Sequence, residues 1–213
     1  WSCNVCVEED PRRAGIVIYE DAEGNGERLF ATGLRNAVGL AINPATGALW
    51  ASNNGRDLMG DDLPPENIFV VEDGLDYGWP YCHSGTIVDP DMGEEGDCEG
   101  VAQPIVEMQA HSAPLGLTFY DGAQFPAEYQ GDLFIAFHGS WNRSVPTGYK
   151  VVRLDMEDGQ PAADQVTDFA AGWLDGTTEE VFGRPVDVTV GADGALYVSD
   201  DKGGLIYRIS YDG

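Results

Sequence analysis

The chain has few cationic side chains and no long apolar run. Its 213 residues include 11 Lys plus Arg against 37 Asp plus Glu, which gives a formal net charge of -26. Contact with DNA, RNA or an anionic membrane surface would therefore begin with electrostatic repulsion. No apolar run approaches the roughly 18 residues of a membrane span. We expect neither a nucleic-acid-binding protein nor a membrane span.

Lysine is especially scarce, since Lys150 and Lys202 are the only two. The acidic residues are spread along the whole chain, so they do not form an acidic tail. A surface this anionic repels itself, and salt relaxes that repulsion by shortening the Debye length. We interpret the excess as adaptation to high salt; an ordinary acidic exported protein is the alternative. With 43% apolar residues the chain has enough material for a folded core.

Cysteine is also rare, with Cys3, Cys6, Cys82 and Cys98 as the four positions. The last two do not form a second C-x-x-C pair, which argues against a four-thiolate zinc site. Val7 follows Cys6 where a c-type haem attachment motif has histidine. We predict disulfides Cys82–Cys98 and Cys3–Cys6, and therefore an oxidising location, periplasmic or extracellular.

No stretch of eleven or more residues has a clear helical apolar period, whereas strand signals recur throughout. A weak internal repeat occurs at 47–52, 131–136 and 194–199. In each copy a glycine turn is followed directly by an apolar strand. Each copy follows a partner strand, at 38–42, 115–119 and 186–190, and each is followed by a third strand, at 67–72, 149–155 and 205–211. The sequence therefore predicts an all-β protein built from repeated three-strand units.

Three-strand units cannot bury both of their faces alone and must stack on one another, as blades of a β-propeller do. Long insertions at 56–66, 83–113 and 138–148 leave room for about three to four blades. The chain also starts at Trp1, and we treat it as a processed or partial sequence. We expect residues 1–213 to form a single partial propeller domain that lacks N-terminal blades.

Arg35 and Asn36 stand immediately before the first partner strand, where they would project from a blade end. A guanidinium offers a planar fork to carboxylate or carbonyl oxygens, and an amide offers both a donor and an acceptor. Arg184 stands just before the last partner strand and is expected to repeat the position of Arg35. Two converging arginines favour an anionic or carbonyl-rich ligand; a salt bridge at the strand entry is the alternative.

An acidic loop follows, with Asp57, Asp61, Asp62 and Glu66 within ten residues. Calcium prefers six to eight oxygens from carboxylates and backbone carbonyls, which a loop of this kind supplies. The spacing does not match an EF-hand, and an acidic loop is unremarkable in so acidic a chain. A calcium site and a plain surface loop both stay open on these residues.

Two of the three histidines, His111 and His138, lie in loops beside strands. A Ser-His-Asp hydrolase would use such a histidine, but the chain contains no Gly-x-Ser-x-Gly motif. Each histidine can equally serve as a hydrogen-bonding loop residue. The segment 142–144 also matches the short glycosylation sequon.

The motifs together resemble the pyrroloquinoline-quinone-dependent sugar dehydrogenases, in the group of soluble glucose and sorbosone dehydrogenases. The segments that carry the resemblance are GLRNAVGL (33–40), NNGRDLMGDDLPPE (53–66), DYGWPYC (76–82), AHSAPLG (110–116), FHGSWNRSVPTGYK (137–150) and GRPVDV (183–188). They occur in the family's order and correspond to the C-terminal part of a typical member.

The resemblance implies a six-bladed propeller that binds the quinone and calcium on its top face. It implies catalytic and quinone-contacting roles for Arg35 and Asn36. Calcium would be held by the backbone carbonyls of Gly55 and Arg56, with Asp61, Asp62 and Glu66 nearby. The other residues expected to bind the cofactor are His111, His138, Arg143 and Arg184. Val186 replaces a second arginine of the family.

The implied reaction oxidises a sugar: a histidine base takes a hydroxyl proton while hydride passes to the quinone. The family's histidine base precedes the cysteine-rich loop at which this chain begins, so we expect the chain alone to be inactive. An electron acceptor of unspecified identity would reoxidise the cofactor. A calcium-dependent lactonase propeller and a non-enzymatic binding propeller are the alternatives.

Overall fold

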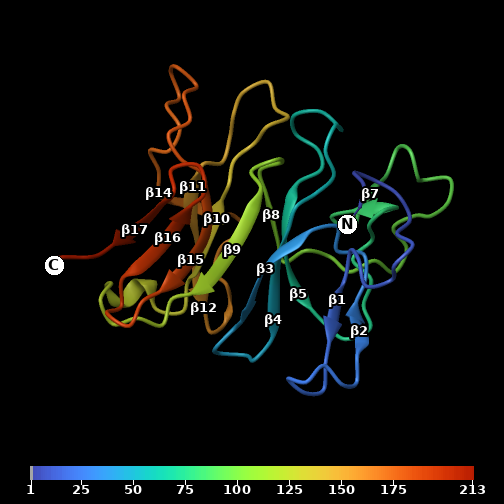
Figure 1. Cartoon of the computed structure of the whole chain (residues 1–213), viewed down its shortest axis with the longest axis horizontal. Helices are drawn as coiled ribbons and strands as arrows, with labels where there is room; N and C mark the ends of the chain where they lie inside the picture. The colour runs from blue at the N-terminus through green and yellow to red at the C-terminus, as the bar shows by residue number, and fades with distance from the viewer. Residues whose placement is uncertain (1) are drawn as a thin grey trace.

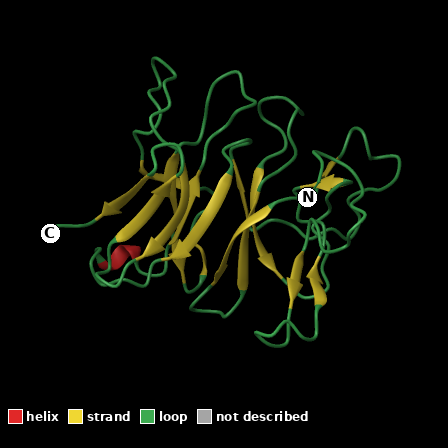
Figure 2. Cartoon of the chain, in the orientation of Figure 1, coloured by secondary structure: helices red, strands yellow, loops and turns green. Residues whose placement is uncertain are grey.

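A computed structural model describes residues 2–213, and its regular structure is almost entirely antiparallel strand (Figures 1 and 2). Within that range the one helical element is the short 3₁₀ turn η1 (Ala127–Tyr129). The prediction of an all-β protein without amphipathic helices is confirmed.

Three larger sheets follow one another along the chain. Each is a meander, in which the strands lie side by side in the order of the sequence. The first sheet comprises β3 (Ala37–Ile42), β4 (Leu49–Asn53), β5 (Glu66–Val71) and β8 (Val106–Met108). The second comprises β9 (Pro114–Phe119), β10 (Leu133–Phe137), β11 (Lys150–Leu154) and β14 (Thr167–Ala170). The third comprises β15 (Pro185–Val190), β16 (Leu196–Asp200) and β17 (Leu205–Ile209).

Three small hairpins complete the described strands. They are β1 (Ile16–Ile18) with β2 (Arg28–Ala31), β6 (Cys82–His83) with β7 (Ile87–Val88), and β12 (Met156–Glu157) with β13 (Gln160–Pro161). Figure 1 shows β1 and β2 beside the first sheet, at the opposite end of the molecule from β17.

The three predicted hairpins and their third strands are confirmed, with ends that shift by one or two residues. Two outer strands, β8 and β14, were not predicted. They are only three and four residues long, and long connections separate them from their partners, so they show little periodicity. They are strands because they pair with β5 and β11, the third strands of the two meanders. This is an effect of tertiary structure rather than of local sequence.

The first strands of the sheets lie side by side, β3 next to β9 and β9 next to β15. The approach is close: a Cβ on Gly39 would lie 2.2 Å from the carbonyl oxygen of Leu115. Ser52 joins the same two strands, because its Oγ accepts from the Gly39 N–H at 2.9 Å and donates to the Leu115 carbonyl at 2.6 Å. The sheets therefore fan out from a shared line of inner strands (Figure 1).

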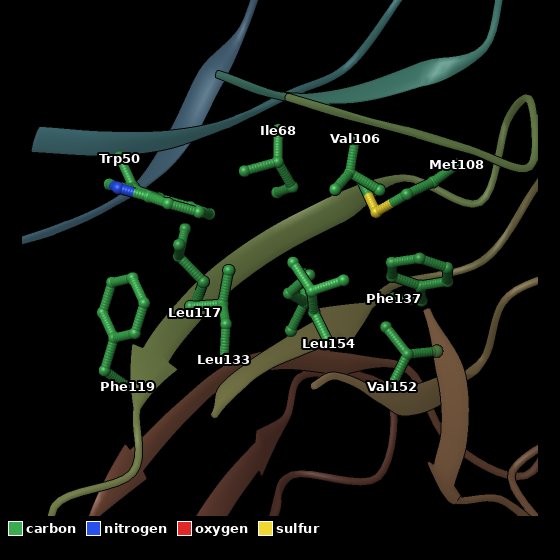
Figure 3. Close-up of a cluster of buried hydrophobic side chains, with 11 residues drawn as sticks. Trp50, Ile68, Val106, Met108, Leu117, Phe119, Leu133, Phe137, Val152 and Leu154 are labelled. Carbon is green, nitrogen blue, oxygen red and sulfur yellow. The ribbon is translucent and has the colours of Figure 1, made fainter. Parts of the chain in front are cut away.

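The core fills the spaces between neighbouring sheets. Side chains alternate along β10, so that Leu133 and Phe137 face the first sheet (Figure 3). Ile135 packs in the same cluster, while Phe134 packs toward the third sheet. All five residues of β10 are buried, which explains why this strand reads as a continuous apolar run rather than an alternating one.

Both predicted disulfides are present, Cys3–Cys6 and Cys82–Cys98. The second closes the acidic loop that contains β6 and β7, and the first closes a short loop near the chain's start. Across residues 2–213 no helix has the length and apolar character needed to span a membrane.

Candidate functional site

One cavity gathers most of the motif residues at a single end of the first two sheets. It has a volume of about 180 Å³. Its walls come from the entry to β3, the β4–β5 connection, the turn before β9 and the loop after β10. The lining residues are Arg35, Asn36, Asn54, Gly55, Asp57, Glu66, His111, Ala113, Leu115, Trp141 and Asn142.

Arg35 lies buried in the cavity wall, with 3% of its surface exposed. Its Nε donates to the Asn4 carbonyl at 3.0 Å. Nη1 donates to the carbonyls of Asn54 (3.4 Å) and Gly55 (2.6 Å), and Nη2 donates to Asn4 Oδ1 and Asp57 Oδ2, both at 3.1 Å. A guanidinium carries five N–H donors, so these five acceptors use all of them.

This saturation changes the role expected of Arg35. It could donate to a quinone oxygen only by giving up one of its present bonds. As it stands, Arg35 contributes a fixed positive charge and ties the β4–β5 connection to the wall. Burial lowers the pKa of its guanidinium, and the neighbouring Asp57 opposes that effect.

Asn36 follows Arg35 at the entry to β3, and its backbone N–H donates to Asn53 Oδ1 at 3.0 Å. Arg184 makes the equivalent bond in the third sheet, where its N–H donates to Asp200 Oδ1 at 2.8 Å. The strand registers agree, since Ala37 pairs with Asn53 and Pro185 with Asp200. Arg184 therefore corresponds to Asn36, and the expected equivalence with Arg35 is wrong by one residue.

Arg184 also faces a different part of the molecule. Its side chain donates to the carbonyls of His138 (3.0 Å) and Gly139 (2.6 Å) and lies over the ring of Tyr149. It is not among the residues that line the cavity. The two arginines are engaged with separate loops in this structure.

Glu66 is buried at the base of the cavity, where it joins two loops. Its Oε2 accepts from the Gly55 N–H at 2.7 Å, and its Oε1 accepts from the Ala113 N–H at 3.2 Å. Burial raises the pKa of this carboxyl to about 7, although the two N–H donors and Arg35 act in the opposite direction.

The acidic loop does not form the carboxylate cluster that its spacing suggested. Asp61 Oδ1 accepts from the Ser144 N–H at 3.0 Å, and the exposed Asp62 lies 3.3 Å from Arg143. Arg143 also donates to the Asp61 carbonyl, which binds this loop to the one after β10. Glu66 instead points into the interior. Asp61, Asp62 and Glu66 therefore do not converge on one cation.

Throughout residues 2–213, Cys3, Cys6 and Glu8 form the one group of three or more His, Cys, Asp or Glu side chains within coordinating distance. Both of these cysteines are in a disulfide, so the group does not offer thiolates to a metal.

Arg56 directs its side chain away from the cavity, into the loop closed by Cys82–Cys98. It contacts Asp89 at 2.6 Å and Asp91 at 2.9 Å. His83 shares the Asp89 carboxylate at 2.7 Å, and burial lowers the pKa of this histidine. Only the backbone of Arg56 is thus left for the predicted calcium contact.

His111 reaches the cavity, but both of its ring nitrogens have partners. Nε2 lies 2.8 Å from the Gly60 carbonyl, so Nε2 carries the proton, and Nδ1 accepts from the Asn142 amide at 3.3 Å. His138 pairs with Asp201 at 3.0 Å and does not line the cavity. Neither imidazole offers the cavity a free basic nitrogen.

Three asparagines complete the cavity's polar surroundings, and the sequence predicted a place in the site for none of them. Asn4 reaches the wall from the Cys3–Cys6 loop. Asn54 and Asn142 line the cavity, and each has a buried side-chain Oδ1 without a hydrogen-bond partner. The indole of Trp141 stands at the cavity with 70% of its surface exposed. Two motif segments contained Asn54 and Asn142, but nothing in the sequence showed their open acceptors.

A family model described as TrAA12-like matches residues 88–212, more than half of the chain. The chain belongs to the TrAA12-like family. The resemblance to pyrroloquinoline-quinone-dependent sugar dehydrogenases drawn from the sequence motifs is confirmed, because related proteins carry such names.

Among sequence relatives, an uncharacterized protein of Borreliella burgdorferi is 36% identical over 97% of this chain and 55% of its own length. The aldose sugar dehydrogenase YliI of Escherichia coli is 29% identical over 88% of this chain and 45% of its own. A pyrroloquinoline quinone-dependent pyranose dehydrogenase of Coprinopsis cinerea is 34% identical over 85% and 31%. The chain therefore spans about half or less of the length of these relatives.

Solved structures agree with the fold. The Trichoderma reesei enzyme of carbohydrate-active family AA12 superposes with a TM-score of 0.70 at 26% identity, covering 87% of this chain and 54% of that one. The pyranose dehydrogenase PQQ domain of Coprinopsis cinerea gives a TM-score of 0.77 at 23% identity, covering 98% and 64%.

Proposed function

We propose that this chain forms part of a sugar dehydrogenase that uses pyrroloquinoline quinone and calcium, with its three sheets as consecutive blades of a six-bladed propeller. The names of the sequence relatives support the activity. The fan of sheets around adjacent inner strands supports the blade assignment. We propose the activity for the whole protein, because this chain spans about half or less of the length of these relatives.

The open oxygens of the cavity carry the proposal. Asn54 Oδ1 and Asn142 Oδ1 are buried without partners, which is costly unless a ligand meets them. The Gly55 carbonyl belongs to the same wall but already accepts from Arg35 at 2.6 Å. Amide oxygens are ligands that calcium takes, so the two asparagines fit a calcium ion better than the dispersed carboxylates do.

The cavity also suits a flat, carbonyl-rich ring. Asn36 offers it an amide, Trp141 offers an exposed aromatic face, and Arg35 supplies a fixed positive charge from the wall. The bound quinone would accept hydride from the sugar, and calcium would polarise the quinone's carbonyl. Arg35 would stabilise developing negative charge through its field, without forming a new hydrogen bond.

The chain's histidines do not supply the proton acceptor for the sugar hydroxyl. The Asn142 amide donates a hydrogen bond to Nδ1 of His111, and His138 lies outside the cavity. We therefore place this base in the remaining length of the full protein, as the family resemblance implies. Two disulfides support export to the periplasm or the extracellular space.

A calcium-dependent quinone titration tests the proposal. The quinone's absorbance and fluorescence should change on addition of the chain when calcium is present, and EDTA should reverse the change. Asn54→Ala and Asn142→Ala should each weaken calcium binding in calorimetry, whereas the exposed Asn25→Ala should not. Absence of quinone binding at saturating calcium would contradict the proposal, and lactone hydrolysis with calcium alone would support the lactonase alternative.

A further inference from the structure

The loop closed by Cys3–Cys6 reaches the cavity wall through Asn4, which pairs with the backbone of Asp57. Asn4 Oδ1 accepts from the Asp57 N–H at 2.7 Å, and Asn4 Nδ2 donates to the Asp57 carbonyl at 2.9 Å. This reciprocal pair fixes the backbone of a residue whose carboxylate lines the cavity.

The same asparagine also holds Arg35. Its carbonyl accepts from Arg35 Nε at 3.0 Å, and its Oδ1 accepts from Nη2 at 3.1 Å. The carbonyl is itself fixed by the Trp79 indole N–H at 3.3 Å. Asn4 thus supplies two of the five acceptors around a buried guanidinium.

The influence of Asn4 extends across the cavity through Asp57. One carboxylate oxygen of Asp57 accepts from Arg35, and the other accepts from the Asn142 amide at 3.2 Å. Asn142 in turn donates to His111 at 3.3 Å. A displacement of Asp57 would therefore reach both walls of the site.

We propose that Asn4 is a positioning residue for Arg35 and Asp57, and that the Cys3–Cys6 disulfide holds it in place. A short disulfide-closed loop has little conformational freedom, so it presents both oxygens of Asn4 with a small entropy cost. The positioning role of Asn4 depends only on these contacts. The expected effect of Asn4 on calcium binding rests, in addition, on the proposed function.

Chemical modification of Arg35 tests the positioning role directly. Phenylglyoxal labelling of Arg35, followed by mass spectrometry, should proceed at least about tenfold faster in Asn4→Ala, because the charged guanidinium loses its hydrogen bond to Asn4 Oδ1 while the backbone carbonyl of residue 4 remains. Ser2→Ala is the matched control: it lies in the same segment, and its hydroxyl contacts Glu8. This control should be labelled at the wild-type rate.

The disulfide provides a second variant. Cys3→Ser/Cys6→Ser should also expose Arg35 to phenylglyoxal, and it keeps Asn4 itself. This variant decides the question if Asn4→Ala does not fold. Wild-type labelling rates in folded Asn4→Ala, or in the folded double variant, would overturn the corresponding half of the proposal; circular dichroism and gel filtration establish that each variant is folded.

Calcium calorimetry supplies a readout that a merely structural role would not move. Asn4→Ala should raise the calcium dissociation constant about tenfold, the usual effect of removing a group that orients ligands. Ser2→Ala should not. An unchanged dissociation constant in Asn4→Ala would overturn the effect on the site. If the wild-type chain binds no calcium, the proposed function fails, and the labelling of Arg35 still decides the role of Asn4.

Discussion

Glu66 accepts a hydrogen bond of 2.7 Å from the backbone N–H of Gly55 at the base of the cavity. Its second oxygen accepts from Ala113 on the turn before β9. One buried carboxyl therefore fixes two loops that belong to different sheets. Burial raises the pKa of this carboxyl to about 7, so its protonation state depends on pH near neutrality.

Stability should depend on pH through Glu66. Its pKa is raised from 4.5 to about 7 on folding, so between these values the folded state binds more protons than the unfolded state. The contribution of Glu66 is then fully present below about pH 4.5 and is lost as pH rises through about 7. Over that window it amounts to roughly 3 kcal/mol, at about 1.4 kcal/mol per pKa unit.

Urea unfolding in EDTA from acidic to neutral pH measures this contribution. The difference in unfolding free energy between wild type and Glu66→Gln should change with pH in that window, because glutamine does not titrate. The exposed Glu72→Gln, directly after β5, is the control. A wild-type minus Glu66→Gln difference that is constant with pH would contradict the raised pKa.

Arg35→Met should destabilise the fold by about 3–5 kcal/mol, the typical cost of removing one partner from a buried charged network. The variant leaves Asp57 without its cation and leaves several carbonyls without a donor. Arg28→Met removes an exposed ion pair with Asp73 and should leave the unfolding midpoint nearly unchanged. Equal unfolding midpoints for Arg35→Met and Arg28→Met would contradict the stabilising role of Arg35.

Ile135→Ala should cost about 2–5 kcal/mol of unfolding free energy, because it leaves a cavity in the core between the first two sheets. Ile206→Ala on β17 removes the same atoms from a side chain that is 74% exposed, and should cost far less. Chemical denaturation of both variants checks the difference. A similar loss in each would contradict the location of the core.

The melting temperature should rise with KCl concentration. At a net charge of -26, self-repulsion is screened as the Debye length falls from about 10 Å at 0.1 M to about 3 Å at 1 M. Thermal scans across that range measure the effect. A flat or falling curve would leave the acidic surface without this explanation.

The isolated chain should not oxidise aldoses at a useful rate, even with quinone and calcium. A positioned general base is typically worth about 10²- to 10⁴-fold, and we place that base outside this chain. Dye-reduction assays after reconstitution measure turnover. Rates typical of an intact dehydrogenase, abolished by His111→Ala or His138→Ala, would show that the base has been misplaced.

The amino-acid sequence alone was enough to predict the three hairpins with their third strands, the disulfide pairs and the family resemblance. Strands such as 133–137 are apolar because both of their faces are buried, and that local signal survives without knowledge of the neighbours. The glycine-led repeat marked the three hairpins, and four cysteines allow only three pairings, of which the one that joins sequence neighbours is present. Motif residues such as Arg35 and Asn36 identified the end of the sheets that holds the cavity.

The packing of the sheets and loops determines which of those residues act together. The acidic loop looked like one ligand set, but Arg143 from a distant loop holds its Asp61–Asp62 part at the surface while Glu66 turns inward. Arg184 matched Arg35 in sequence and matches Asn36 in strand register. Hydrogen-bond partners such as Asn4 lie 31 residues from Arg35. Contacts across such separations depend on how sheets pack, and no local pattern encodes them.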